Sequence, residues 1–160
     1  MTFVPTADLC DRHADRLGVL APGLEHFGGV RAFAGLVTTL RVRRDNALVR
    51  ETLSQPGHGR VLVVDGGAVV DRALVGGRLG ELAEQNGWAG IVVWGAVRDR
   101  LELAACQVGV LALASCPLPS AKAGVGERDV PVDVGGAIIH PGQWLAADAD
   151  GVVVADQPLE

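Results

Sequence analysis

Val61-Leu62-Val63-Val64-Asp65-Gly66-Gly67 is the stretch that decides the fold, because an uninterrupted apolar run of strand length ends there in a turn signal. Two further apolar runs follow it, Ile91–Trp94, which ends at Gly95, and Val108–Ala114. Apolar runs of this length are typical of strands that are buried on both faces. The sequence therefore predicts three such strands in the middle of the chain.

Helical patterns separate these three runs. Residues 79–83 hold apolar side chains at helical spacing, after Gly76-Gly77 and before Asn86-Gly87, which is a good helix stop. A second, shorter helix is expected over Asp99–Ala105. Buried strands that alternate with helices indicate βαβ units and a parallel sheet.

The N-terminal part of the chain extends this pattern. A helix is expected over Thr6–Arg16, with Asp8 placed to cap it. Residues 33–42 alternate and are rich in β-formers, which predicts a strand, and Asn46–Leu53 is expected to form a short helix.

From Val130 onward the chain changes to short strand-like runs separated by turn signals. The turn signals are Gly135-Gly136, Pro141-Gly142 and Asp150-Gly151. We therefore expect residues 1–160 to form a single α/β domain with a central β-sheet, βαβ units in the middle and a β-rich C-terminal part. This arrangement is a sandwich of the swivelling β/β/α type.

Composition and charge narrow the possible functions. The net charge is −5, and the one basic cluster, Arg41-Val42-Arg43-Arg44, is followed at once by Asp45, which argues against direct nucleic-acid binding. The apolar runs are too short to span a bilayer, and Met1–Cys10 lacks a signal-peptide pattern, so a cytoplasmic location with no membrane contact is expected. The three cysteines form no C-x-x-C pair, which predicts reduced, mostly buried thiols.

Ligands of parallel α/β sheets gather beyond the carboxyl ends of the strands, where helices begin. Gly76-Gly77-Arg78-Leu79 stands at such a helix start, where backbone N–H groups lack helical partners and glycine lets a ligand approach. A carboxylate bound there would gain about 0.3–1 kcal/mol from the helix dipole. The alternative is a purely structural turn, since glycine is the usual residue for positive φ angles.

A second candidate site directly follows the run Ile91–Trp94, where Arg98 stands beside Asp99. The guanidinium of Arg98 could hold a substrate carboxylate or keto oxygen, and Asp99 could hold a hard divalent cation such as Mg²⁺ or Mn²⁺. The alternative is a surface ion pair or a cap for the next helix.

Several segments resemble the RraA family, in order and over nearly the whole chain. The longest are Gly87–Asp99, with Gly-Trp-Ala-Gly-Ile-Val-Val-Trp-Gly-Ala-Val-Arg-Asp, and Ser120–Val130. The shorter ones are Phe27–Gly29, Asp45–Leu48, Val61–Gly67 and the late Gly135-Gly136, Pro141-Gly142, Ala147-Asp148 and Asp150-Gly151. The family includes regulators of ribonuclease activity A and 4-hydroxy-4-methyl-2-oxoglutarate aldolases that also decarboxylate oxaloacetate. Its older label as a menaquinone methyltransferase finds no support, because no glycine-rich nucleotide loop follows the first strand.

The resemblance implies a role for each candidate residue. The loop Gly76-Gly77-Arg78-Leu79 would donate N–H groups to a pyruvyl carboxylate, and Arg98 would bind the keto or enolate oxygen. Asp99 would anchor the divalent metal. Independently of the resemblance, Glu102 stands three residues beyond Asp99, within helical reach of it, and is expected to support the metal shell. The family resemblance also implies a homotrimer with sites at the subunit interfaces.

A competing aldolase mechanism uses a lysine, whose amine forms a Schiff base with the keto group of the substrate. The chain has one lysine, Lys122, in a Gly/Ser-rich stretch apart from the strand ends discussed above. A solvent-facing or ion-paired residue is therefore the preferred interpretation of Lys122.

Two departures from the family pattern lower the expected activity. Gly77 stands where many dedicated aldolases carry an acidic residue, and the sequence ends at Glu160, without the C-terminal extension of those enzymes. The prediction is thus a class II, metal-dependent lyase of modest activity that forms pyruvate enolate from a 2-keto acid. It would cleave 4-hydroxy-4-methyl-2-oxoglutarate, decarboxylate oxaloacetate, or both. The alternative is a non-catalytic regulator that binds and inhibits an RNase E-type endoribonuclease.

Overall fold

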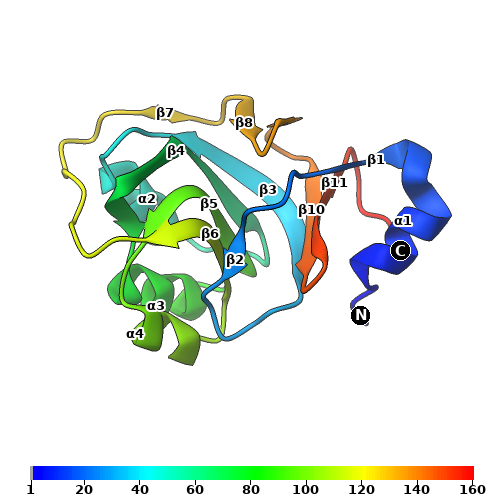
Figure 1. Ribbon diagram of the computed structural model, residues 1–160, viewed down its shortest axis with the longest axis horizontal. Helices are drawn as coiled ribbons and strands as arrows, with labels where there is room; N and C mark the ends of the chain where they lie inside the picture. Colours follow the sequence, from blue (N-terminus) through cyan, green and yellow to red (C-terminus); the bar gives the residue numbers. More distant parts are fainter. Residues whose placement is uncertain (1) are drawn as a thin grey trace.

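The computed structural model describes residues 2–160, and a parallel sheet lies at its centre (Figure 1). Its strands are β3 (Phe33–Arg41), β4 (Val61–Val75), β5 (Gly90–Val97) and β6 (Gly109–Ser115), adjacent in that order and parallel throughout. The parallel sheet that the apolar runs predict is therefore confirmed.

Strand β4 is longer than the sequence predicts. We expected it to end at Asp65-Gly66-Gly67, but it continues to Val75. Gly67 and Ala68 have φ angles of 68° and 61°, and the register with β5 shifts between Asp65 and Val69. The glycines therefore form a β-bulge within the strand and do not end it, because a bulge inserts residues without breaking the ladder beyond them.

Antiparallel strands extend both edges of this sheet. Next to β3 lies the hairpin of β10 and β11, followed by β1, while β2 borders β6 and β7 borders the end of β3. A separate hairpin is formed by β8 and β9. The bounds of these strands are Leu17–Val19 (β1), Glu25–His26 (β2), Glu127–Arg128 (β7), Val132–Val134 (β8), Ala137–Ile139 (β9), Trp144–Asp148 (β10) and Gly151–Ala155 (β11). The hairpins predicted at 135–136 and 150–151 are confirmed.

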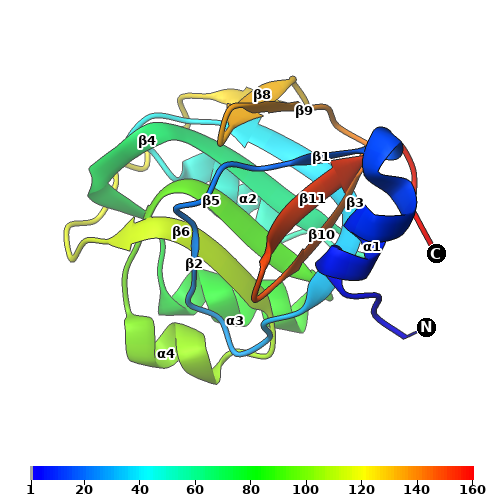
Figure 2. The same ribbon diagram turned by 45° about the vertical axis from the view of Figure 1, so that its right-hand side comes forward.

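Two apolar clusters make the molecule a layered sandwich (Figures 1 and 2). On one face of the parallel sheet, alternate residues such as Leu62 and Val64 pack against α2 (Ala47–Leu53), α3 (Gly77–Gln85) and α4 (Arg100–Ala105). On the other face, residues such as Val61 and Val63 pack against the hairpins β8–β9 and β10–β11. This β/β/α order confirms the predicted fold class, and the helices at 46–53 and 99–105 form within one residue of their expected bounds.

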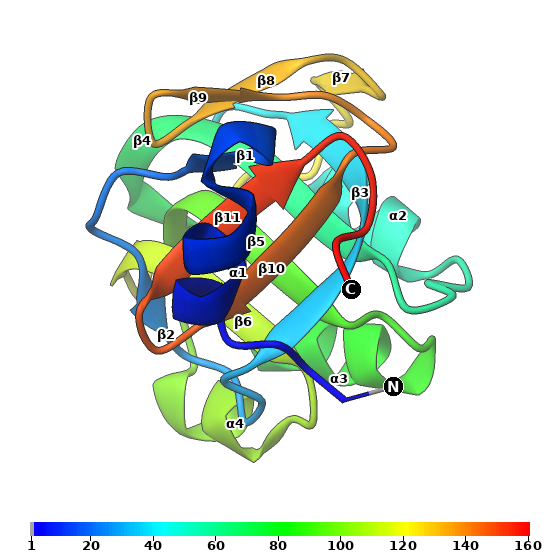
Figure 3. The same cartoon turned by 90° about the vertical axis from the view of Figure 1, so that its right-hand side faces the viewer.

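Helix α1 (Thr6–His13) covers the outer face of β10 and β11 and continues as the 3₁₀ turn η1 (Ala14–Arg16), as Figure 3 shows. Asp8 does not cap it, contrary to our prediction, because the helix begins earlier, after Pro5. Instead the carboxylate of Asp148 accepts hydrogen bonds from the Thr6 N–H at 2.7 Å and the Thr6 hydroxyl at 2.6 Å. The cap is thus supplied across the fold, which the local sequence could not reveal.

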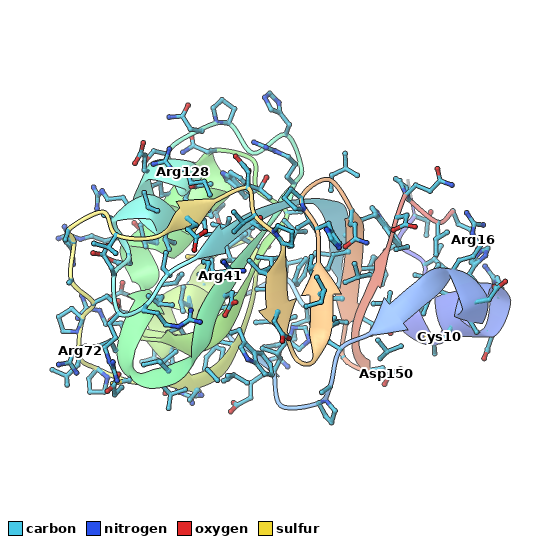
Figure 4. The ribbon with its side chains drawn as sticks, turned by 90° about the horizontal axis from the view of Figure 1, so that it is seen from above. Cys10, Arg16, Arg41, Arg72, Arg128 and Asp150 are labelled. Carbon is cyan, nitrogen blue, oxygen red and sulfur yellow. The ribbon has the colours of Figure 1, made fainter. Side chains whose placement is uncertain are left out.

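The three cysteines are free thiols, as expected, although only Cys106 is fully buried. Cys10 lies on α1, at the opposite end of the molecule from Arg72 of β4 (Figure 4). No helix within residues 2–160 combines the length and the apolar character needed to cross a bilayer.

The aromatic ring of Phe33 packs against the first residues of β5 and β6. Phe33 is 5% exposed, and its ring lies against Gly90 and Gly109, which face each other in the register of β5 and β6. A Cβ at Gly90 would lie 2.9 Å from Cζ of Phe33 and closer still to other ring atoms. The two glycines therefore make room for the ring.

We predict that Gly90→Ala lowers the free energy of unfolding by about 1–3 kcal/mol, because the ring must leave its packed position. Gly18→Ala is the matched control, since a Cβ there meets nothing within 4 Å and its φ is not positive. The control should change stability by less than about 0.5 kcal/mol. Urea unfolding of both variants measures the difference, and equal effects would contradict the proposed packing role.

Candidate functional site

A pocket of about 460 Å³ opens where β4 and β5 end and α3 begins. The N–H of Arg98 donates to the carbonyl of Val75 at 2.9 Å, so the ends of the two strands are held together. The pocket is lined by Asn46, Ala47, Arg50, Ala73, Gly76, Arg78, Leu79, Arg98, Asp99, Glu102, Pro119 and Lys122. Of the residues predicted around Gly76 and around Arg98, all except Gly77 line this one pocket.

The first turn of α3 borders this pocket through Arg78 and Leu79. The Gly80 N–H donates to the carbonyl of Gly76 at 3.0 Å and begins the helical hydrogen-bond pattern. The Gly77 N–H donates to Oδ2 of Asp99 at 2.9 Å. Arg78 and Leu79 lie in the first turn, where helix geometry leaves N–H groups without helical acceptors. These two groups are the donors available to an anion in the pocket.

Asp99 has an unusual backbone conformation, with φ 62° and ψ 52° in the left-handed region. For a residue other than glycine this conformation costs roughly 1 kcal/mol. Asp99 is the N-cap residue of α4, yet its carboxylate makes no cap bond to that helix and reaches the N-terminus of α3 instead. Backbone strain and an external carboxylate contact are features typical of functional sites.

Arg98 is half-buried beside it, and its Nη1 donates to the carbonyl of Pro117 at 3.3 Å. Within residues 2–160, Arg98 forms no ion pair with Asp99. The surface ion pair that we considered as an alternative is therefore not formed, and the guanidinium retains donors for a ligand.

Lys122 lies in this pocket, which corrects our sequence-based interpretation. Its side chain is exposed, as expected, but it is not apart from the strand ends, because it lines the same cavity as Arg98 and Asp99. Sequence reasoning also missed Arg50 of α2 as a lining residue. No local pattern marks either cation, and only the fold brings them to the strand ends.

The loop that carries Lys122 is held by Asp45, which is 3% exposed. Its carboxylate accepts N–H groups from Ala47 at 3.0 Å, Ala123 at 2.9 Å, Gly124 at 3.2 Å and Val125 at 3.4 Å. Burial alone would raise the pKa of the Asp45 carboxyl, but these donors stabilise its ionised form and hold the pKa below its ordinary value. Asp45 is thus a charged clamp between α2 and the loop.

The pocket combines cationic and anionic side chains. Four cationic side chains line it, together with the carboxylates of Asp99 and Glu102. No group of three or more metal-ligating side chains forms within the described residues 2–160. Two carboxylates nevertheless fit Mg²⁺ or Mn²⁺, because such ions are held by one or two carboxylates and keep water or substrate oxygens as further ligands.

Comparisons with known proteins point to one family. A family model described as RraA-like, Aldolase/RraA, matches residues 6–154. A protein from Burkholderia mallei (strain SAVP1), named with an inferred activity as a 4-hydroxy-4-methyl-2-oxoglutarate aldolase, is 60% identical over 159 residues, with 96% of each chain covered.

Two solved structures share the fold closely. The RNA-processing inhibitor RraA from Thermus thermophilis has a TM-score of 0.95 and 47% identity, with coverage of 99% of this chain and 96% of that one. A structure from Geobacillus kaustophilus HTA426, described as an S-adenosylmethionine: 2-dimethylmenaquinone methyltransferase, has a TM-score of 0.95 and 45% identity, with coverage of 98% and 97%.

We predict that Asp45→Ala lowers the free energy of unfolding by about 2 kcal/mol at pH 7, because the loop amides lose their acceptor. The pKa of Asp45 is lower in the folded than in the unfolded protein. Its contribution is therefore complete above the unfolded pKa of about 4 and disappears as the pH falls through the folded value.

Urea unfolding of wild type and Asp45→Ala at pH 7 and near pH 3 measures this dependence. Asp71→Ala is the control, because Asp71 pairs with Arg44 on the surface, with 54% of its side chain exposed. It should change stability by less than about 1 kcal/mol. A wild-type advantage over Asp45→Ala that persists unchanged at the lower pH contradicts the prediction.

Proposed function

The chain belongs to the Aldolase/RraA family, and on that premise we propose that it is a divalent-metal-dependent lyase that forms pyruvate enolate. Its substrates would be 4-hydroxy-4-methyl-2-oxoglutarate, which is cleaved to pyruvate, and oxaloacetate, which is decarboxylated. The observation that supports this proposal best is the convergence of Arg98, Asp99 and the first turn of α3 on one pocket.

The pocket suits a 2-keto dicarboxylic acid with one carboxylate at each end. The free N–H groups of Arg78 and Leu79 would receive the carboxylate next to the keto group, favoured by the helix dipole. Arg50 and Lys122 line the same cavity and would attract the second carboxylate. The substrate would thus be bound at both ends with its keto group between them.

Arg98 would stabilise the charge that develops in the reaction. When the C3–C4 bond breaks, its electron pair forms a double bond between C3 and C2, and the C2 carbonyl becomes an enolate. The second product is CO₂ from oxaloacetate, or a second pyruvate when the C4 hydroxyl of the aldol substrate loses its proton. The enolate then takes a proton at C3 from water. A guanidinium aimed at the enolate oxygen stabilises the transition state more than the ground state.

Asp99 is the side chain that we propose to hold the metal ion, with Glu102 near it. A bound divalent cation supplies positive charge for the keto oxygen as it becomes an enolate. In this proposal Lys122 forms no Schiff base although it is near, because a guanidinium and a cation would stabilise the same charge.

We further propose a homotrimer whose sites lie between subunits. Large apolar side chains stand exposed around the pocket and support an interface there, with Leu101 89%, Leu118 52% and Val125 68% exposed. Leu118 precedes the lining residue Pro119, and Val125 lies on the loop of Lys122. Covering them by a second subunit would also exclude water from the pocket.

A second candidate function is inhibition of an RNase E-type ribonuclease. Its support is the 47% identity to a structure described as an RNA-processing inhibitor. The net charge of −5 is also suited to docking on a basic protein segment. The presence of Arg98 and Asp99 in one pocket favours the lyase, because a surface inhibitor needs no such site.

We predict that purified protein decarboxylates oxaloacetate with Mg²⁺ or Mn²⁺ and that a chelator stops the reaction until metal is restored. Arg98→Ala and Asp99→Ala should each lower kcat/KM about 100-fold or more. Lys122→Ala should mainly raise KM, by about 10-fold, because it binds the second carboxylate.

Arg16→Ala is the control, since Arg16 lies at the α1 end of the molecule, opposite Arg72 (Figure 4). Its activity should match wild type. The site is wrongly assigned if Arg98→Ala and Asp99→Ala both retain full turnover.

For the second candidate, we predict that a resin carrying the basic tail of an RNase E-type enzyme retains the protein at about 0.05 M salt and releases it near 0.3 M, because screening weakens charge attraction. A resin carrying an acidic protein serves as the control. Absence of salt-sensitive retention eliminates the inhibitor hypothesis.

A further inference from the structure

Gly76 and Gly77 are not required for their backbone conformation. Gly76 has φ −129° and ψ −169°, which is extended backbone open to any residue, and Gly77 is the first residue of α3. Neither is among the glycines with positive φ. The reason for two consecutive glycines must therefore be the space that their missing side chains leave.

Two carboxylates occupy that space. A Cβ at Gly76 would lie 2.7 Å from Oδ2 of Asp99. A Cβ at Gly77 would lie 2.8 Å from Cβ and 2.9 Å from Cδ of Glu102 and would overlap a carboxylate oxygen of that residue. Because neighbouring Cα atoms are about 3.8 Å apart, the two carboxylates lie against adjacent residues of one turn.

The two carboxylates differ in their partners. Asp99 accepts the Gly77 N–H, whereas the Glu102 carboxylate has no hydrogen bond or ion pair with any of residues 2–160. Glu102 lines the pocket together with Asp99, and the two carboxylates lie against neighbouring residues at the start of α3. The side chain of Glu102 is therefore available to a cation that Asp99 holds.

We propose that Gly77 and Glu102 act as a coupled pair, in which the glycine admits the Glu102 carboxylate to the cation site of Asp99. This proposal rests on the proposed lyase function. Glu102 is the second carboxylate of the site, and Gly77 is a positioning residue that acts only through it. Cations of the Mg²⁺ class are held by one or two carboxylates. Asp99 and Glu102 together would therefore supply the protein's share of the ligands.

The test measures binding of Mn²⁺ alone, by the electron paramagnetic resonance signal of the free ion, without substrate or turnover. Wild type is compared with Glu102→Gln, Gly77→Ala, Glu102→Ala and the double variant Gly77→Ala/Glu102→Ala. Glu81→Gln is the matched control, because it removes one exposed negative charge from α3 outside the pocket. Thermal unfolding by circular dichroism confirms that each variant is folded.

Glu102→Gln is expected to raise the Kd for Mn²⁺ about 10–100-fold. Gly77→Ala should raise it comparably in the wild-type background, because its methyl group displaces Glu102, and should have no further effect once Glu102 is alanine. This non-additivity is the signature of a coupled pair. Glu81→Gln should leave the Kd within about two-fold of wild type.

Two results overturn the coupling. The first is an unchanged Kd in Glu102→Gln, and the second is an equal effect of Gly77→Ala with and without Glu102. Should Gly77→Ala fail to fold, Glu102→Gln alone still decides whether the carboxylate contributes.

Asp99→Ala separates the coupling from the proposed function. If Asp99→Ala leaves Mn²⁺ binding intact, the cation site of the proposed function is wrong. If Asp99→Ala removes binding and Glu102→Gln does not, only the coupling is wrong.

Discussion

The hydrogen bond between the Gly77 N–H and the Asp99 carboxylate joins the start of one helix to the end of a neighbouring strand. It depends on the left-handed backbone of Asp99, which directs the carboxylate back toward α3 and away from its own helix. The adjacent bond from the Arg98 N–H to Val75 keeps β4 and β5 in register at the same level. Together these two contacts fix the ends of β4 and β5 and the start of α3, and with them the backbone of the lining residues Arg78 and Arg98.

Much of the fold could be predicted because its signals are local. The apolar runs at 61–64, 91–94 and 108–114 require burial on both faces, and the layers on either side supply it. The errors arose where tertiary contacts decide. Gly66-Gly67 marks a turn by its local sequence, yet pairing with β5 carries β4 past it, and the cap of α1 comes from Asp148 on β10.

The part of the candidate site that follows from local sequence signals was likewise predictable, and the part that depends on tertiary contacts was not. Gly76 and Arg98 could be placed together because the carboxyl ends of adjacent parallel strands meet at one edge. Lys122 could not, since its position depends on the buried carboxylate of Asp45 some eighty residues earlier. The resemblance suggested that Gly77 lacks a useful acidic side chain. In three dimensions, Glu102 lies where a side chain at position 77 would begin.

The ring of Phe33 leaves no space for larger side chains where β5 and β6 start. At the end where β5 and β6 start, even a methyl group meets the ring, so the sequence there is constrained by close packing. At the opposite end Gly76 and Gly77 are similarly constrained, but exposed side chains that line the pocket, such as Lys122 and Glu102, can be exchanged without entering the core. The ligands presented at this edge could therefore change while the scaffold beneath remained the same.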